Sequence, residues 1–398
     1  MSTRALDSRT LWLLGTCAFA SMASMRICDA MLPSLAAEFS ATTGQVARTI
    51  SGFALAYGLL QLFYGPLGDR YGKVRVIAFA TLACTIGSMA AALAPSLDWL
   101  VAGRILSGVA AAGIIPLTMA WIGDSVAYEG RQEVLARLLG ATVFGMICGQ
   151  WLGGLVAEVW NWRAAFALLA TIFLVGGAML TRRARGLASP ARPDMASVPR
   201  RLLDVLAQPW ARTVLLVTCI EGALAFSALA FIPSHLHASF KLSMPAAGAV
   251  VALYGVGGLV YSRCARVLLR RFGETGLATT GGVSLGIAFA AIATAPSWPW
   301  TLPACMLAGF GFYALHNTLQ THATQMAPTA RGTAVSLFAC VLFLGQSLGV
   351  LLASWVVDTA STSMVFASSA LGLLLLGVAF ATLIRQRNSR LRQGVIDA

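Results

Sequence analysis

The apolar positions of this 398-residue chain form long runs, separated by short connections that carry Gly, Pro and charged residues. A helix of roughly 20 apolar residues crosses a hydrocarbon core of about 30 Å. Twelve runs reach that length, and they lie near 11–37, 46–68, 76–95, 99–121, 138–158, 164–181, 213–236, 245–268, 276–295, 300–325, 332–357 and 363–384. The pattern predicts an all-α membrane protein with about twelve transmembrane helices.

Composition supports this class. Hydrophobic residues make up 58% of the chain and charged residues 11%, whereas soluble domains carry about 25% charged residues. The formal net charge of +13 does not indicate a nucleic-acid partner, because the charges lie in connections between apolar runs. The eight Cys residues and four His residues show no metal-ligand spacing, so no metal or cofactor is expected.

The basic residues predict an orientation. Of the 28 Lys and Arg residues, 23 fall in the two termini and in alternate connections, namely 69–75, 124–137, 182–212, 263–274 and 326–331. Only three lie in the opposite connections, Arg48, Arg163 and Lys241. By the positive-inside rule, both termini are cytoplasmic, which requires an even number of spans. The expected location is the cell membrane, which in a bacterium is the inner membrane.

The two halves of the chain look like copies of each other. Short sequences recur in the same order at offsets between 196 and 200, as in Pro33-Ser34 with Pro233-Ser234 and Gly149-Gln150 with Gly345-Gln346. This predicts an N-terminal six-helix bundle over 1–181, a cytoplasmic linker over 182–212 with a short amphipathic helix near 200–207, and a C-terminal six-helix bundle over 213–398. Two such bundles enclose a chamber near the membrane midplane.

The connection after the second span reads GPLGDRYGK, from Gly65 to Lys73. It resembles the signature G-x-L-[GA]-D-[RK]-x-G-[RK]-[RK] of the major facilitator superfamily, and only Val74 departs from it. The matching positions are Gly65, Leu67, Gly68, Asp69, Arg70, Gly72 and Lys73.

The resemblance implies two pseudo-symmetric bundles and a gating role for this connection. In such a fold Asp69 would face a helix N-terminus near Arg331 and could pair with Arg131, and Asp124 joins the same group of charges. These contacts would hold the cytoplasmic side shut. The alternative is that the charges only set the topology.

Further motifs resemble the twelve-span drug:proton antiporter branch of that superfamily. Arg104 to Gly108 matches its RxxxG element, and the antiporter motif corresponds to Gly145, Gly149 and Gly153. Gln150 stands where that motif has Pro, which leaves symport open. We expect these glycines to pack helices closely, together with the equivalent Gly345 and Gly349, while the amides of Gln150 and Gln346 bridge helices.

Ionisable groups at membrane depth need a partner or a function. Asp29 in span 1 and Arg104 in span 4 lie at matching depths, so Arg104 is expected to hold Asp29 charged until the pair loosens and Asp29 takes a proton. The alternative is a permanent pair of Asp29 with Arg104 or Arg26. Glu221 in span 7 has no basic neighbour within a turn and is either a second proton site, a contact for cationic substrates or a helix-bridging group.

Span 10 carries a polar stripe that includes His316, Asn317 and Gln320. A stripe of this kind does not face lipid, so it lines the chamber or packs on another helix. With Met22, Met25 and Arg26 of span 1, these residues form the predicted substrate cavity.

The function that these features favour is proton-coupled export of small lipophilic or cationic organic compounds by a monomer. The alternative is a symporter or uniporter of an organic anion or metabolite that binds to Arg26 and Arg104. An enzyme is not expected, because the chain has no GxSxG, HExxH or GxxxxGK[ST] motif. The expected partners are the small-molecule substrate, protons and the lipid bilayer.

Overall fold

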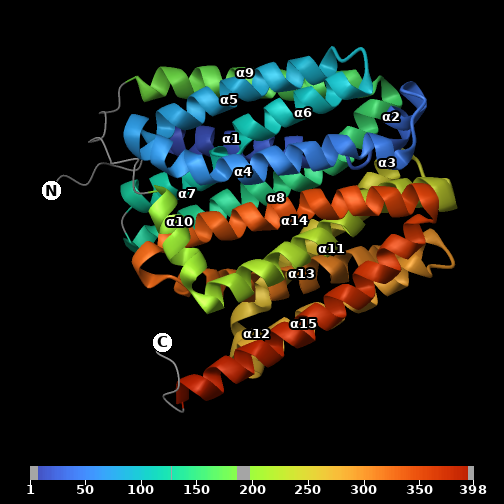
Figure 1. Cartoon of the computed structure of the whole chain (residues 1–398). Helices are drawn as coiled ribbons and strands as arrows, with labels where there is room; N and C mark the ends of the chain where they lie inside the picture. The colour runs from blue at the N-terminus through green and yellow to red at the C-terminus, as the bar shows by residue number, and fades with distance from the viewer. Residues whose placement is uncertain (1–7, 127, 186–197, 393–398) are drawn as a thin grey trace. The chain divides into compact units, whose positions relative to one another are not determined.

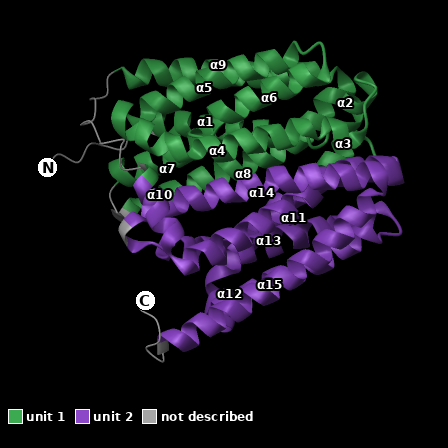
Figure 2. Ribbon diagram, in the orientation of Figure 1, with its two compact units in different colours: residues 1–199, 242–249 green, residues 200–241, 250–398 purple. Residues whose placement is uncertain are grey.

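The computed structural model describes residues 8–126, 128–185 and 198–392, and no strand occurs among them. The chain divides into two compact units, residues 1–199 with 242–249 (unit 1) and residues 200–241 with 250–398 (unit 2) (Figure 2). Part of the predicted linker, residues 186–197, lies outside the described residues, as do residues 1–7 and 393–398 of the predicted cytoplasmic termini. The domain boundaries at 181 and 213 stay predictions.

Unit 1 is a bundle of helices that cover the first six predicted spans (Figure 1). Its elements are α1 (Ser8–Arg26), α2 (Leu32–Glu38), α3 (Thr43–Val46), α4 (Arg48–Tyr71), α5 (Lys73–Ala92), α6 (Leu97–Ala111), α7 (Ile114–Ser125), α8 (Tyr128–Val159) and α9 (Trp162–Ala184). Helix α1 packs along α8, α5 packs between α9 and α6, and α4 packs on α6.

Two predicted spans of unit 1 are broken. Span 1 divides into α1 and α2, and span 4 divides into α6 and α7. Each break is followed by a proline in the first turn of the next helix, Pro33 in α2 and Pro116 in α7. Proline has no N–H to donate to the carbonyl four residues earlier, as a continuous helix would require. Proline alone does not force a break, because Pro233 lies inside the continuous helix α11 (Pro209–Phe240).

Unit 2 contains α10 (Val198–Ala207), α11, most of α12 (Met244–Ala293), α13 (Thr301–Gln325), α14 (Arg331–Thr359) and α15 (Thr362–Arg392). Helix α10 occupies the place of the predicted amphipathic helix. Helix α11 packs on α14, α15 and α13. The 50 residues of α12 cover two predicted spans and change direction at Gly273, whose φ of 63° is non-helical.

Within the described part of the chain, nine helices are long and apolar enough to cross a membrane. Helix α12 is one of them and accounts for two predicted spans. The remaining two predicted spans correspond to the broken α1–α2 pair and to α13, which carries the polar stripe. The structure thus has the helices of a twelve-span protein.

Glycines bring the same pair of helices together in each unit. A methyl group at Gly145, Gly149 or Gly153 of α8 would overlap a backbone carbonyl oxygen of predicted span 1. A methyl group at Gly345 or Gly349 of α14 would overlap a carbonyl oxygen of α11. In all five contacts the carbonyl belongs to the residue 126 positions earlier in the chain, so the duplicated sequences make equivalent contacts.

Substitution of Gly145 by Ala should lower the free energy of unfolding by about 1–3 kcal/mol, because the added methyl group must push α1 away from α8. Gly140→Ala, on the same helix, is the control, since nothing lies within 4 Å of its Cβ position. Thermal unfolding of both purified variants in detergent measures the difference. Equal melting temperatures would contradict this packing.

Candidate functional site

A fully buried carboxylate lies at the break in span 1. Asp29 is 0% exposed, and its Oδ2 lies 3.5 Å from Nη1 of Arg26. The same oxygen accepts a hydrogen bond from Nε2 of Gln150, on α8, at 3.5 Å. The other oxygen, Oδ1, has no hydrogen-bond partner among the described residues. Because a buried charge is unfavourable unless it is paired, these two partners govern the charge state of Asp29.

Arg104 is a further buried charge of unit 1, and it is also 0% exposed. Its Nη1 donates to Oγ of Ser24 (3.2 Å), and its Nε donates to the backbone carbonyl of Thr49 (3.4 Å). The guanidinium lies over the ring of Phe53, 4.3 Å from the ring centroid. Its Nη2 has no hydrogen-bond partner in the described part of the chain.

Asp29 and Arg104 form no direct ion pair within the described ranges, although their charges are close enough to interact. Of the two partners that the sequence left open for Asp29, the structure has Arg26, three residues earlier in the chain. Matching depth on two helices is not sufficient for contact, because the side chains must also face each other. The polar partners of Arg104, Ser24 and Thr49, were not predicted, since no sequence pattern links them to it.

A cavity of about 860 Å³ lies in unit 1 between α1, α7 and α8. Trp12, Phe19 and Phe144 provide aromatic surfaces to its lining, and the rings of Phe19 and Phe144 are 5.6 Å apart. Glu133 and Arg137, an ion pair one turn apart on α8, are the charged residues of the lining. The cavity can accept a largely apolar molecule that carries a charge.

The residues of span 1 that the sequence assigned to a substrate cavity lie elsewhere. Met22, Met25 and Arg26 are absent from the lining of this cavity; Met25 and Arg26 are buried and Met22 is half-buried. Trp12 was missed, although its separation of seven residues from Phe19 places the two side chains on one face of a helix.

The charged residues of the predicted gating connection meet around Lys73. Its Nζ lies 2.9 Å from Oδ1 of Asp69 and 2.7 Å from Oδ2 of Asp124. Arg131 donates to the backbone carbonyls of Gly123 (2.6 Å) and Val126 (3.3 Å). The structure therefore ties the end of α4 to the end of α7 through one lysine. The predicted contacts of Asp69 with Arg131 and with the start of the eleventh span stay predictions.

The glycines of this connection have different surroundings. Gly72 separates α4 from α5 with φ 93° and ψ 124°, a conformation that residues with a Cβ rarely adopt. A methyl group at Gly68 would overlap the side chain of Leu117 on α7, whereas nothing lies within 4 Å of a Cβ at Gly65. Arg70 lies over the ring of Tyr71.

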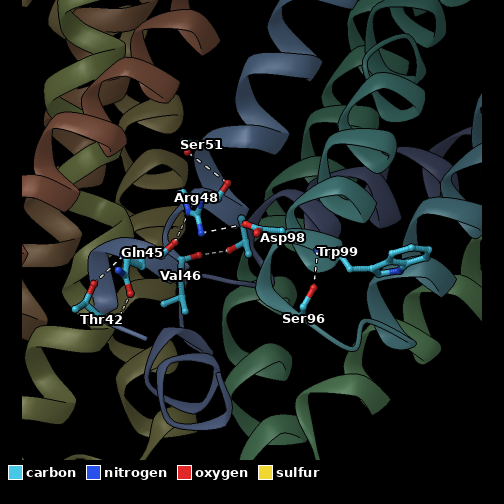
Figure 3. A network of polar contacts seen from close by, with 9 residues as sticks. Thr42, Gln45, Val46, Arg48, Ser51, Ser96, Asp98 and Trp99 are labelled. Atoms are coloured by element: carbon cyan, nitrogen blue, oxygen red, sulfur yellow. Dashed lines mark hydrogen bonds and ion pairs between the residues drawn. The ribbon is translucent and has the colours of Figure 1, made fainter. Parts of the chain in front are cut away.

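At the other end of α4, polar contacts join its first turn to α6 (Figure 3). Arg48 pairs with Asp98 at 3.2 Å, and its Nε donates to the carbonyl of Gln45. Thr49, in the same turn, also supplies the carbonyl that Arg104 binds. Through the Thr49 carbonyl, the buried guanidinium of Arg104 therefore binds the same first turn of α4 that carries Arg48.

In unit 2, the buried Glu221 pairs with His316, which is partly exposed. Glu221 is 0% exposed, and its Oε2 lies 2.9 Å from Nδ1 of His316 on α13. Asn317 is half-buried and Gln320 is exposed. The amide of Gln346, unlike that of Gln150, has no hydrogen-bond partner among the described residues. The described residues also contain no group of three or more side chains that could hold a metal ion.

Membrane-spanning helices that bury a few paired charges define the class of a transporter. The chain belongs to the Major Facilitator Superfamily, whose sequence pattern matches residues 14–348. It is therefore a membrane-spanning transporter and not an enzyme, as the resemblance implied.

Named relatives agree with this family. The chain is 23% identical over 352 residues to an uncharacterized MFS-type transporter, YceJ of Bacillus subtilis, covering 87% of this chain and 88% of the relative. It is 32% identical to the multi-drug resistance efflux pump PmrA of Streptococcus pneumoniae over 41% of each chain. It is 27% identical to the lincomycin resistance protein of Streptomyces lincolnensis over 46% of this chain and 40% of the relative.

Solved structures share the fold at low identity. The nucleoside transporter NupG gives a TM-score of 0.78 at 13% identity and covers 94% of this chain and 99% of its own. The POT family transporter PepTSo gives a TM-score of 0.79 at 14% identity and covers 96% of this chain and 99% of its own. Both likenesses show the fold alone.

Substitution of Gly72 by Ala should lower the free energy of unfolding by about 1–3 kcal/mol, because alanine is strained at this φ and ψ. Gly65→Ala in the same motif should be neutral or slightly stabilising, since its Cβ would meet open space inside a helix. Thermal unfolding of the two variants in detergent compares them. An equally stable Gly72→Ala protein would show that the turn does not need glycine.

Proposed function

We propose that the chain is a proton-coupled exporter of small lipophilic or cationic organic compounds, which works by alternating access. The observation that carries this proposal is the fully buried Asp29, placed where a spanning helix is broken and bound on one oxygen by Arg26 and Gln150. Its second oxygen, without a hydrogen-bond partner in the described part of the chain, can accept a proton.

Protonation of Asp29 would alter two contacts at once. The neutral carboxyl no longer attracts the Arg26 guanidinium, and it accepts more weakly from the Gln150 amide. Gln150 lies on α8, whose neighbouring glycines contact the backbone of span 1. Gain of a proton on one side of the membrane and its loss on the other would thereby bias the conformation of unit 1.

The cavity between α1, α7 and α8 supports the substrate class. Aromatic rings attract organic cations through their faces, and three aromatic side chains line this space. Glu133 adds a negative charge that a cationic group can share with Arg137. The names of PmrA and of the lincomycin resistance protein describe efflux and drug resistance, which favours export of organic compounds.

The proposal includes an orientation. The termini and the connection around Lys73 are assigned to the cytoplasm by the excess of basic residues, and the protein is assigned to the cell membrane as a monomer. The cavity then lies near the cytoplasmic end of α1, where an exporter collects its substrate.

Asp29→Asn should lower proton movement driven by substrate, because the amide cannot exchange the proton that Asp29 carries. Protein in liposomes with an imposed pH gradient is followed by a lumenal pH dye while aromatic monocations such as ethidium, and lincomycin, are added. Asp98→Asn is the control, since that carboxylate is exposed. Proton movement that no compound stimulates, and that survives Asp29→Asn, would overturn the coupling.

The open Nη2 of Arg104 favours one alternative, a symporter or uniporter of an organic anion. The two functions differ in what Arg104→Ala does. At an anion site the variant should lose substrate binding, seen as at least a tenfold rise in KM, whereas in a proton-coupled exporter it should keep binding and lose coupling. Initial rates of uptake with and without the pH gradient separate the two outcomes.

A further inference from the structure

The Glu221–His316 pair of unit 2 differs from the Asp29–Arg26 pair of unit 1 in the basic residue that faces the acid. Glu221 faces His316, whose ring stacks on Phe312 (4.9 Å between centroids) and lies 5.2 Å from Phe338 of α14. Its second oxygen, Oε1, is buried and has no hydrogen-bond partner among the described residues. Gly222, the residue after Glu221, packs against the backbone carbonyl of Leu342, so α14 lies directly against α11 at this point.

Among the described residues, no Lys or Arg forms an ion pair with this carboxylate. Arg212 and Arg331 stand in the first turns of α11 and α14, and α13 contains neither Lys nor Arg. On α15, residues 362–384 include no titratable side chain. The other titratable residues of these helices are Cys219, His235 and His237 on α11, Cys305, Tyr313 and His322 on α13, and Cys340 and Asp358 on α14. On α12 they are Tyr254, Tyr261, Arg263, Cys264, Arg266, Arg270, Arg271 and Glu274.

This difference decides what each pair can do. A guanidinium such as Arg26 keeps its charge at every physiological pH, so the charge of its pair changes only with the acid. Imidazole gains and loses its proton between about pH 5 and 8. The Glu221–His316 pair is electrically neutral when it holds one proton, on either Oε2 or Nδ1, and it acquires a buried net charge when that proton leaves or a second one arrives.

The carboxylate of unit 2 is not a copy of Asp29. When the two halves are aligned on Gln150 and Gln346, Ala225 takes the place of Asp29, and Glu221 lies four residues, about one helical turn, earlier. The amide of Gln346 accordingly has no carboxylate beside it. The two halves therefore share this helix, but Glu221 does not stand at the position of Asp29 and pairs with a different residue, His316.

We propose that Glu221 and His316 together form a second proton site, located in unit 2, which takes up one proton and releases it during each transport cycle. The proposal rests on proton-coupled transport. Uptake forms one N–H or O–H bond within the pair and release breaks it, with no other bond changed. Transport by this chain then uses two chemically different proton sites, one with a permanent cation and one with a titratable partner.

Proton binding tests the site without any substrate. Purified wild-type protein and the variants Glu221→Gln and His316→Gln are titrated in detergent between about pH 5 and 8 with an indicator dye. Each variant should bind about one proton fewer per molecule than wild type, and the double variant should lose no more than that. Glu274→Gln, which alters the half-exposed Glu274–His322 pair, should leave the titration of the 221–316 pair in place.

Folding and transport controls complete the experiment. Glu221→Asp keeps the carboxylate and should keep the proton, which separates loss of the site from loss of the fold. In liposomes, the number of protons moved per transported probe should fall by one in Glu221→Gln.

The second site would be overturned if the titration curves of Glu221→Gln and wild type coincided, or if the number of protons moved per transported probe did not change. Absence of probe-stimulated proton movement in wild type would instead overturn proton coupling, and the detergent titration would still decide whether the pair binds a proton.

Discussion

Two helices in a bilayer gain little by hiding apolar surface from lipid, so their association depends on how closely their backbones approach. In this protein that approach is provided by glycines of α8 and α14, each set against a carbonyl oxygen of the first helix of its own half. The contact does more than hold the bundle together. Gln150 follows one of these glycines directly, and the close approach brings its amide within reach of Asp29. The hydrogen bond from Gln150 to Asp29 therefore depends on the absence of side chains at the neighbouring glycines.

The helices were predictable because membrane spans leave a strong signal of length and apolarity. The ends of the helices were harder to predict. Helix α8 begins at Tyr128, ten residues before the predicted span. The helix continues into a segment with charged residues, and a span drawn from apolar residues alone stops where that segment begins. The breaks before Pro33 and Pro116 were also missed. Pro66 and Pro233 sit inside intact helices, so proline identifies where a break is possible without saying whether it occurs.

For the candidate site, the sequence identified which residues carry charge in the membrane but not which of them meet. The local pair of Asp29 with Arg26 could be considered because the two lie one turn apart. Glu221 and His316 are 95 positions apart on different helices, and each had a separate interpretation. Their pairing depends on the rotation of α11 and α13 about their own axes, which no periodicity along one chain reveals.

The two halves kept a common packing scheme while their chemistry diverged. The first spanning helix of unit 2 is continuous through Pro233, but in unit 1 the corresponding helix stops at Arg26 and resumes at Leu32. A continuous helix resists bending because each turn is bonded to the next. In residues 27–31 that pattern gives way to turns, in which Asp29 N–H donates to the carbonyl of Arg26 and Met31 N–H to that of Cys28. The acid proposed to exchange a proton thus lies between two helical segments, where a change in its charge would act on the angle between them.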